Sequence, residues 1–518
     1  MKKEIILFIF IFLLASFLRL YKINVLPPGL HGDEAQSGIE ALKILEGAPY
    51  FPYSTEVYGQ TTLYFYLVAG VIKLFGPSPM AIRLTSALLG IVTIPLFYIF
   101  VRYFLGKKVA FLSTFFLAIS RWHIHLSRLG LMSITTTLFQ VGTFLFFLKG
   151  LKTKNLSDFL LAGIFLTLGL NSYMAFRFVP LILLVLIVYL AVSKRKLLRK
   201  NVPGLSLFLI TTLILSLPLL FYALDSTDIF MGRINSILIF NNHSLNELPA
   251  IISENLKGVT LMFNIRGSTW PHKNLPGAPM LDLITGLAFL VGLGLAIYRV
   301  KKPIYFLFLI NLLIMLSISV FSEPIYPAAG DPIRSNGAII SVFIFAGSGT
   351  CWLWNQLKKI RSAIIPILII AFILNFKAYF IDFAQHPAVW HDFHFVPLEV
   401  AKLANSNQNT HIYLLSDWFY SDYLSIRFLS PSFSGENFFH QLGKYTPKDK
   451  LLPLKENLDK DSLFVALPFY NQYLDRLKEV YPEGERKEYY GGPEGNLIFS
   501  SFFVPQKVAG AKAKNYGQ

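Results

Sequence analysis

Cysteine is almost absent from this chain of 518 residues, because Cys351 is the only one and lies inside an apolar run. A single cysteine excludes an intrachain disulfide and any metal site built from several cysteines. Acidic residues are also scarce, with 30 Asp and Glu against 47 Lys and Arg, which gives a net charge of +17. That charge would suit a nucleic-acid-binding protein, but the sequence lacks zinc-finger spacing, a glycine-rich phosphate loop and a basic–aromatic motif. We therefore expect no nucleic-acid partner.

Apolar residues are abundant instead, at 54% hydrophobic against 15% charged, which is the composition of a polytopic membrane protein. Apolar segments recur at the length of about 20 residues that crosses a bilayer. The first follows Met1-Lys2-Lys3 and has no small-residue cleavage site before Arg19, which favours an uncleaved span over a signal peptide. Eleven spans are predicted, near residues 5–21, 81–101, 109–120, 131–148, 157–172, 178–193, 203–222, 281–298, 304–321, 337–356 and 363–381.

Basic residues fall in short clusters between these spans, which is typical of cytoplasmic loops. With eleven spans, every cluster from Lys2-Lys3 to Lys358-Lys359-Arg361 lies on one side of the membrane. The brief apolar segment 61–75 would break this pattern if it crossed, so we expect a juxtamembrane helix there and an amphipathic helix at 35–46. The N-terminus is then cytoplasmic, and the predicted extracytoplasmic segments are 22–80, 121–130, 173–177, 223–280, 322–336 and everything after about 382.

The composition changes after about residue 382, where charge rises and the long apolar runs stop. Strand-like segments alternate there with helical ones, which indicates a small α/β domain. The predicted strands are 411–415, 463–467 and 496–504, and the predicted helices are 396–403, 417–428 and 470–480. The sequence thus divides into a transmembrane domain, 1–382, and an extracytoplasmic α/β domain, 383–518, whose tail from Gln506 is expected to be disordered.

The polar stretch 27–38 places two adjacent carboxylates, Asp33 and Glu34, where the chain leaves the first span. Charge at a membrane edge is by default a functional hypothesis. The alternative is that both residues favour the start of the helix predicted after them, since acidic side chains stabilise a helix N-terminus. The other predicted outer loops also collect isolated ionisable residues, among them Arg128, Arg177 and Arg334.

These residue types suit the transfer of a sugar from a lipid-phosphate carrier to an acceptor. A carboxylate can act as the general base for an acceptor hydroxyl or amine. Arginine suits the departing polyprenyl phosphate, because its planar fork binds phosphate oxygens bidentately and keeps its charge. Direct displacement assisted by one base predicts inversion at the anomeric carbon, without the paired carboxylates of glycoside hydrolases.

An ordered series of motifs runs through the first 190 residues: Gly32-Asp33-Glu34-Ala35 after the first span, then Thr62-Leu63-Tyr64-Phe65-Tyr66, Ala81-Ile82-Arg83-Leu84-Thr85 and Arg102-Tyr103-Phe104-Leu105-Gly106. This series resembles the GT-C superfamily of polyprenyl-phosphate-dependent glycosyltransferases. Within it, the resemblance is to the branch of protein O-mannosyltransferases and bacterial aminoarabinose transferases. It implies a polytopic α-helical GT-C fold of about eleven transmembrane helices plus juxtamembrane helices, with the small C-terminal α/β domain.

The acidic pair of the first outer loop lies in the active site of that family, which implies Asp33 as the general base and Glu34 as its partner. Family members often carry a second Asp after the third span, but residues 127–133 contain no acid, so Arg128 becomes a candidate for the donor phosphate. The snorkelling of arginines at a membrane edge is the alternative explanation for Arg128 and for Arg177. The donor-phosphate candidates are Arg128, Arg177 and Arg334, and the other cavity candidates are His31, Tyr58, His125 and Tyr173.

Relatives by resemblance work without a divalent ion, and His123 and His125 have no third ligand at a suitable spacing. No cofactor is therefore expected, although the sequence leaves a bound divalent ion open. The expected partners are a polyprenyl-phosphate-linked sugar, the bilayer, and a glycan, lipid or protein acceptor. A transporter or a flippase of lipid-linked glycans is the alternative function, but transporters usually show paired repeats, broken helices and mid-membrane charges. A non-catalytic membrane scaffold that displays residues 383–518 is a third interpretation.

Overall fold

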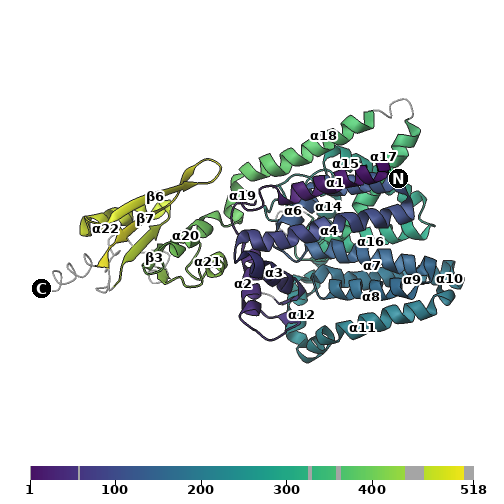
Figure 1. Ribbon diagram of the computed structural model, residues 1–518, viewed down its shortest axis with the longest axis horizontal. Coiled ribbons are helices and arrows are strands. Elements are labelled where there is room, and N and C mark those ends of the chain that lie inside the picture. The colour runs from purple at the N-terminus through teal and green to yellow at the C-terminus, as the bar shows by residue number, and fades with distance from the viewer. Residues whose placement is uncertain (1, 57–58, 325–329, 358–362, 438–459, 507–518) are drawn as a thin grey trace. The chain divides into compact units, whose positions relative to one another are not determined.

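The computed structural model describes residues 2–56, 59–324, 330–357, 363–437 and 460–506, and Figure 1 shows its ribbon. The chain forms two compact units. The first consists of Met1–Ile23, Ala41–Gly76 and Met80–Phe383, and the second of Asn24–Glu40, Pro77–Pro79 and Ala384–Gln518. The stretch that carries the acidic pair therefore groups with the C-terminal part of the chain, although it is separated from it by more than 300 residues of sequence.

Each of the eleven predicted spans coincides with a helix of the first unit (Figure 1). Apolar runs form helices because a helix satisfies the backbone N–H and C=O groups within its own segment, as a hydrocarbon environment requires. These helices are α1 (Lys2–Leu20), α4 (Pro79–Leu105), α5 (Lys107–Ile119), α7 (Ile134–Thr153), α8 (Leu156–Leu170), α9 (Val179–Ser193), α11 (Val202–Asp225), α15 (Leu283–Tyr298), α16 (Pro303–Val320), α17 (Ile339–Gln356) and α18 (Ile364–Lys377).

Seven helical segments of the described chain are long and apolar enough to cross a bilayer, and an eighth is counted if α5 and α6 (Arg121–Arg128), bent by 54°, form one span. The apolar helices α8 and α15 have only 15 and 16 residues. At the helical rise they reach roughly 22–24 Å, which is less than the hydrocarbon core of about 30 Å. The predicted fold class of a polytopic helical membrane protein is confirmed, while helix length alone supports fewer spans than the eleven predicted.

Short helices and a hairpin fill the segments between the spans. The predicted helices at 35–46 and 61–75 are present as α2 (Gly32–Leu45) and α3 (Leu63–Phe75). Between them, β1 (Tyr53–Ser54) pairs antiparallel with β2 (Gln60–Thr61). The long segment 223–280 is partly helical, and the remaining short helices are α10 (Arg195–Lys200), α12 (Thr227–Ile237), α13 (Ile239–Asn242) and α14 (Leu248–Leu261).

Glycine allows α15 and α17 to pack closely. A Cβ atom added to Gly292 would overlap the main-chain oxygen of Phe345, and one added to Gly349 would overlap that of Ala288. Small residues at such a contact let two backbones approach each other, which is how membrane helices gain packing energy without a hydrophobic driving force.

The second unit contains a five-stranded mixed sheet in the order β4–β3–β5–β7–β6, of which β3, β6 and β7 are labelled in Figure 1. Strands β3 and β5 are parallel, with Ile412 opposite Leu463 and Leu414 opposite Val465, so these apolar side chains share one face. Strand β7 runs antiparallel to both of its neighbours. The strands are β3 (His411–Leu415), β4 (Gly435–Asn437), β5 (Ser462–Ala466), β6 (Glu485–Gly491) and β7 (Asn496–Val504), and the helices are α19 (Pro387–Asp392), α20 (Phe395–Asn405), α21 (Leu424–Leu429) and α22 (Asn471–Val480).

The three predicted strands of this domain match β3, β5 and β7 closely, but β4 and β6 were not predicted. Strand β6 is an edge strand, and its charged side chains Glu485, Lys487 and Glu488 are exposed. Charges on an edge strand hide the period-two apolar pattern by which strands are recognised. The predicted helix 417–428 is shorter in the structure, where α21 begins at Leu424. The tail predicted to be disordered lies outside the described residues after Gln506.

The segment 24–40 packs against the first C-terminal helices of the second unit. A Cβ atom on Gly29 would overlap the main-chain oxygen of Phe393, so only glycine fits there. The Ser425 hydroxyl donates a hydrogen bond of 2.8 Å to the main-chain oxygen of Leu30. These contacts hold the residues directly before α2 on the C-terminal domain.

Candidate functional site

A cavity of about 370 Å³ opens in the first unit, between elements that are far apart in sequence. The β1–β2 hairpin, the short helix Met174–Phe178, the α12–α13 segment, the end of α16 and the turn before α17 all contribute. The lining residues are Tyr53, Gly59, Gln60, Thr61, Met132, Ser172, Tyr173, Met174, Ala175, Arg177, Phe178, Arg233, Ile234, Ile237, Leu238, Phe240, Ser317, Ile318, Phe321, Ser322 and Arg334. Most of them come from segments predicted from charge to lie on one side of the membrane.

Three arginines line the cavity: Arg177, Arg233 and Arg334. The Arg177 guanidinium lies over the Phe230 ring, 4.2 Å from its centroid. Tyr53 stacks on Tyr222 and tilts against Phe230, with ring centroids 5.2 Å apart in both pairs. Burial raises the pKa of the Tyr53 phenol and Arg177 acts in the opposite direction, so the phenol stays neutral near pH 7. Aromatic rings therefore hold the first arginine in place.

The third arginine is held by a carboxylate. Arg334 Nε lies 3.2 Å from Asp331 Oδ2, and Lys273 Nζ lies 3.0 Å from the same oxygen. Burial by itself raises the pKa of Asp331, but the two cations and the main-chain donors outweigh it and lower the pKa to about 2. Asp331 is therefore ionised at neutral pH, and Arg334 has a fixed partner.

Most of the remaining cavity wall is apolar. Large aliphatic, aromatic and thioether side chains contribute most of its surface, and they are Met132, Met174, Phe178, Ile234, Ile237, Leu238, Phe240, Ile318 and Phe321. Guanidinium groups bind phosphate oxygens through charge-assisted hydrogen bonds, while apolar walls favour a hydrocarbon chain. A cavity with both features suits an amphipathic ligand with an anionic head.

The acidic pair lies in the first turn of α2, in the second unit. Asp33 is exposed, and its main-chain N–H donates to Nδ1 of His31 at 3.2 Å. Glu34 is buried, and its Oε2 accepts from the main-chain N–H of His31 at 3.2 Å. The buried carboxylate thus satisfies an N-terminal backbone donor, as a capping side chain does, whereas the Asp33 carboxylate faces outward.

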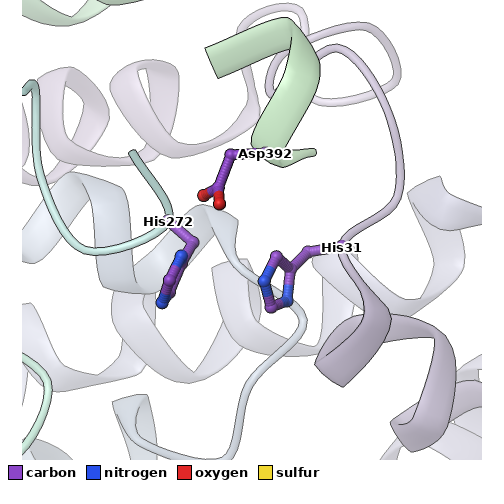
Figure 2. A group of neighbouring side chains, drawn as sticks. All are labelled: His31, His272 and Asp392. Carbon is purple, nitrogen blue, oxygen red and sulfur yellow. The ribbon is translucent and has the colours of Figure 1, made fainter. Parts of the chain in front are cut away.

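His31 is part of an aromatic and imidazole cluster in the second unit. Its ring stacks on that of His394 with the centroids 5.3 Å apart. A ring nitrogen of His31 lies within 4.8 Å of a carboxylate oxygen of Asp392 (Figure 2). His394 Nε2 lies 2.9 Å from the Tyr423 hydroxyl. Burial and the neighbouring His31 lower the pKa of His394 to about 4, against the opposing effect of Asp392. The cluster holds the residues just before Asp33 in one conformation.

The remaining predicted residues lie at three kinds of position. Tyr173, Arg177 and Arg334 share the cavity of the first unit. Arg128 is buried outside the lining of that cavity, where its Nη1 donates to the main-chain oxygen of Arg19 at 3.0 Å and its guanidinium lies over the rings of Tyr379 and Phe380. His125 is buried in the same helix, with Nε2 3.0 Å from the main-chain oxygen of His272. Tyr58 lies outside the described residues.

Sequence reasoning missed Arg233 as a cavity residue. The segment 223–280 was predicted to lie outside the membrane, but nothing in the spacing separated Arg233 from other polar residues of that segment. The signal that could have found it is the amphipathic pattern of α12, which places Arg233, Ile234 and Ile237 on one helical face at i, i+1 and i+4.

Sequence and structure comparisons indicate similarity to the same group of proteins. Residues 60–222 match the sequence profile of the family described as dolichyl-phosphate-mannose-protein mannosyltransferase. No curated protein sequence matches the chain significantly. The fold is similar to that of ArnT from Cupriavidus metallidurans in the apo state, with a TM-score of 0.56 at 12% identity over 98% of this chain and 99% of ArnT.

Two further solved structures have the same fold. ArnT from Cupriavidus metallidurans bound to undecaprenyl phosphate gives a TM-score of 0.54 at 13% identity, covering 96% of this chain and 97% of ArnT. The oligosaccharyltransferase of Archaeoglobus fulgidus, tethered to an acceptor peptide containing the NVT sequon, gives 0.51 at 14% identity, covering 96% of this chain and 74% of that protein.

The chain thus has the fold of ArnT, and residues 60–222 resemble the family of protein mannosyltransferases. These findings confirm the resemblance drawn from the motifs of the first 190 residues.

Proposed function

We propose that this protein transfers a sugar from a polyprenyl-phosphate-linked donor to an acceptor on the extracytoplasmic side of the membrane. The N-terminus is cytoplasmic in this proposal, and the C-terminal α/β domain is extracytoplasmic, as the distribution of basic clusters predicts. The observation that carries the proposal is the cavity in which Arg177, Arg233 and Arg334 accompany apolar walls.

The cavity supports this donor class on two chemical grounds. A polyprenyl phosphate joins an anionic head to a long hydrocarbon chain, and the cavity offers guanidinium groups for the first and apolar side chains for the second. As the bond to the sugar breaks, the phosphate gains negative charge, so positive groups fixed in advance stabilise the transition state. Undecaprenyl phosphate bound to ArnT, which has the same fold, also supports this class of carrier.

Asp33 is the general base of the proposed reaction. Its exposed carboxylate takes the proton from the acceptor hydroxyl or amine while the acceptor oxygen or nitrogen bonds to the anomeric carbon. The bond from that carbon to the phosphate oxygen breaks, and the electron pair leaves on the polyprenyl phosphate. One displacement inverts the anomeric configuration. Glu34 acts as a partner that fixes the first turn of α2 through its hydrogen bond with His31.

The experiment begins with lipid extracts of cells that make the protein and of cells that lack it. We expect a carrier-linked sugar to accumulate in cells without the protein, because its consumption is blocked. That lipid, isolated and radiolabelled, is then incubated with the purified full-length protein and membranes of the deficient cells. The label should move to an acceptor with the opposite anomeric configuration.

Asp33→Asn should fold and lose this transfer, while Glu46→Gln, which changes an exposed acid directly after the end of α2, should retain it. Unchanged transfer by Asp33→Asn would refute Asp33 as the base. Movement of the intact labelled lipid across the membrane, with no transfer of its sugar, would instead support the flippase alternative and overturn the proposal.

A further inference from the structure

We propose that Asp331 is a positioning residue for the donor, because it fixes the guanidinium of Arg334 in the orientation that receives the phosphate. The inference rests on the proposed function of the cavity. It adds a residue that lines no part of the cavity.

Asp331 is itself held rigidly. Its Oδ1 accepts the main-chain N–H groups of Ile333 at 2.9 Å and of Arg334 at 3.1 Å, which closes a tight turn of the kind that Asp side chains favour. Its own main-chain N–H donates to the Ser319 hydroxyl at the end of α16, at 2.9 Å. The side chain is buried. The carboxylate therefore has one position relative to the helix that forms the cavity wall.

Two contacts orient the guanidinium of Arg334. Nε pairs with Asp331 Oδ2 at 3.2 Å, and Nη1 donates to the main-chain oxygen of Glu323 at 3.1 Å. Among the described residues, Nη2 of Arg334 has no hydrogen-bond partner, and the side chain lines the cavity. Two of the three guanidinium nitrogens are thus held by the protein, and the third is the one left for an anion.

The charges of this cluster also favour an anionic ligand. Lys273 and Arg334 bring two positive charges to the single negative charge of Asp331, so the triad carries a net charge of +1. The Glu323 carboxylate is engaged elsewhere, with its Oε2 3.0 Å from His243 Nε2 and its Oε1 2.7 Å from Asn242 Nδ2. Asp331 therefore orients Arg334 without cancelling the charge of the cluster.

The physical benefit is a smaller entropy cost on binding. A free arginine side chain gives up rotamer entropy when it is immobilised, whereas Arg334 is already ordered by Asp331 before the phosphate arrives. A planar fork binds phosphate well only when its plane is correctly aimed. Loss of Asp331 should therefore weaken phosphate binding even though Arg334 keeps its charge.

The test uses purified full-length protein in lipid nanodiscs, with undecaprenyl phosphate as the probe and its dissociation constant as the readout. Loss of a hydrogen bond to a charged group corresponds to a weakening of about tenfold or more, and this is the effect expected for Asp331→Asn and for Arg334→Gln. The double variant should bind no more weakly than Arg334→Gln alone, because Asp331 acts only through Arg334. Asp331→Glu, which keeps the charge, should recover part of the affinity.

Arg266→Gln is the matched control, since Arg266 is an exposed cation that neither lines the cavity nor pairs with Asp331. Its dissociation constant should stay within about twofold of that of the parent protein, a factor smaller than a single hydrogen bond to charge. A purely structural role of Asp331 would give additive losses in the double variant, and that result would overturn the inference. Unchanged binding by Arg334→Gln together with Arg177→Gln would instead overturn the proposed function of the cavity.

Discussion

Arg19 donates through Nη1 to the main-chain oxygen of Ala118 at 3.1 Å, at the point where α5 ends and the chain bends into α6. The same guanidinium reaches Ala15 at 2.9 Å within its own helix and lies 2.7 Å from His123 Nδ1. Carbonyl groups at a helix end have no partner within the helix, and in a membrane they cannot rely on water. A buried arginine from another helix therefore makes this break possible.

Substitution of Arg19 by methionine should destabilise the protein without touching the cavity. The carbonyl of Ala118 would lose its donor in a buried setting, at a cost of about 2 kcal/mol. The midpoint of thermal unfolding in detergent should fall by roughly 3 °C or more. Arg195→Met, at an exposed position of α10, is the control and should leave the midpoint unchanged.

Arg233→Gln should weaken the use of the donor. Arg233 lines the cavity from α12, and the loss of a charge-assisted contact to phosphate should raise the KM for the carrier-linked sugar by about tenfold. Arg266→Gln removes an exposed positive charge that does not line the cavity, so its KM should match that of the parent. Equal effects of both substitutions would mean that only long-range charge matters.

The Asp331 carboxylate should make stability depend on pH in the acid range. Its pKa in the folded protein is about 2, below its ordinary value of 3.8, so the folded state binds the proton less readily than the unfolded state. The stabilisation, about 2 kcal/mol by linkage, is present in full above pH 4 and is lost as the pH falls towards 2. Thermal unfolding of the parent and of Asp331→Asn should therefore converge between pH 4 and pH 2.

His394 should give a second pH dependence at milder values. Burial and His31 lower its pKa from 6.5 to about 4, so the unfolded chain binds the proton more readily in this interval. The stability contributed by neutral His394 is complete above pH 6.5 and falls as the pH drops through 4. Between pH 6.5 and 4.5, the unfolding midpoint should decline more steeply for the parent than for His394→Phe. Parallel slopes would contradict a contribution of His394 to the decline.

The hydrophobic pattern of the sequence was sufficient to predict much of the fold. Runs of apolar residues identified a helix at each of the eleven predicted spans, and strand-like segments at 411–415, 463–467 and 496–504 identified three of the five strands of the C-terminal sheet. The same reasoning failed for β6, where the residues around Glu485 and Lys487 face solvent at the edge of the sheet. The hydrophobic pattern of a sequence indicates which side chains are buried. An edge strand buries few side chains, so its pattern is weak.

The cavity was only partly predictable. The distribution of basic clusters between the spans predicted that Tyr173, Arg177 and Arg334 lie in outer loops. The structure brings these three residues together in the cavity. That distribution could not separate them from Arg128, whose contact with the carbonyl of Arg19 joins residues 109 positions apart. Whether an arginine meets a carbonyl or a cavity depends on such distant contacts, which one sequence does not reveal.

Residues 24–40 belong to the same compact unit as Ala384–Gln518, while Ala41–Gly76 and Met80–Phe383 belong to the other unit. A protein shortened after Phe383 would retain every membrane helix, yet Gly29 and Leu30 would lose Phe393 and Ser425. The segment just before Asp33 would then lose the contacts that fix its conformation. Exchange of C-terminal domains between relatives should therefore succeed only when the first extramembrane loop is exchanged with them.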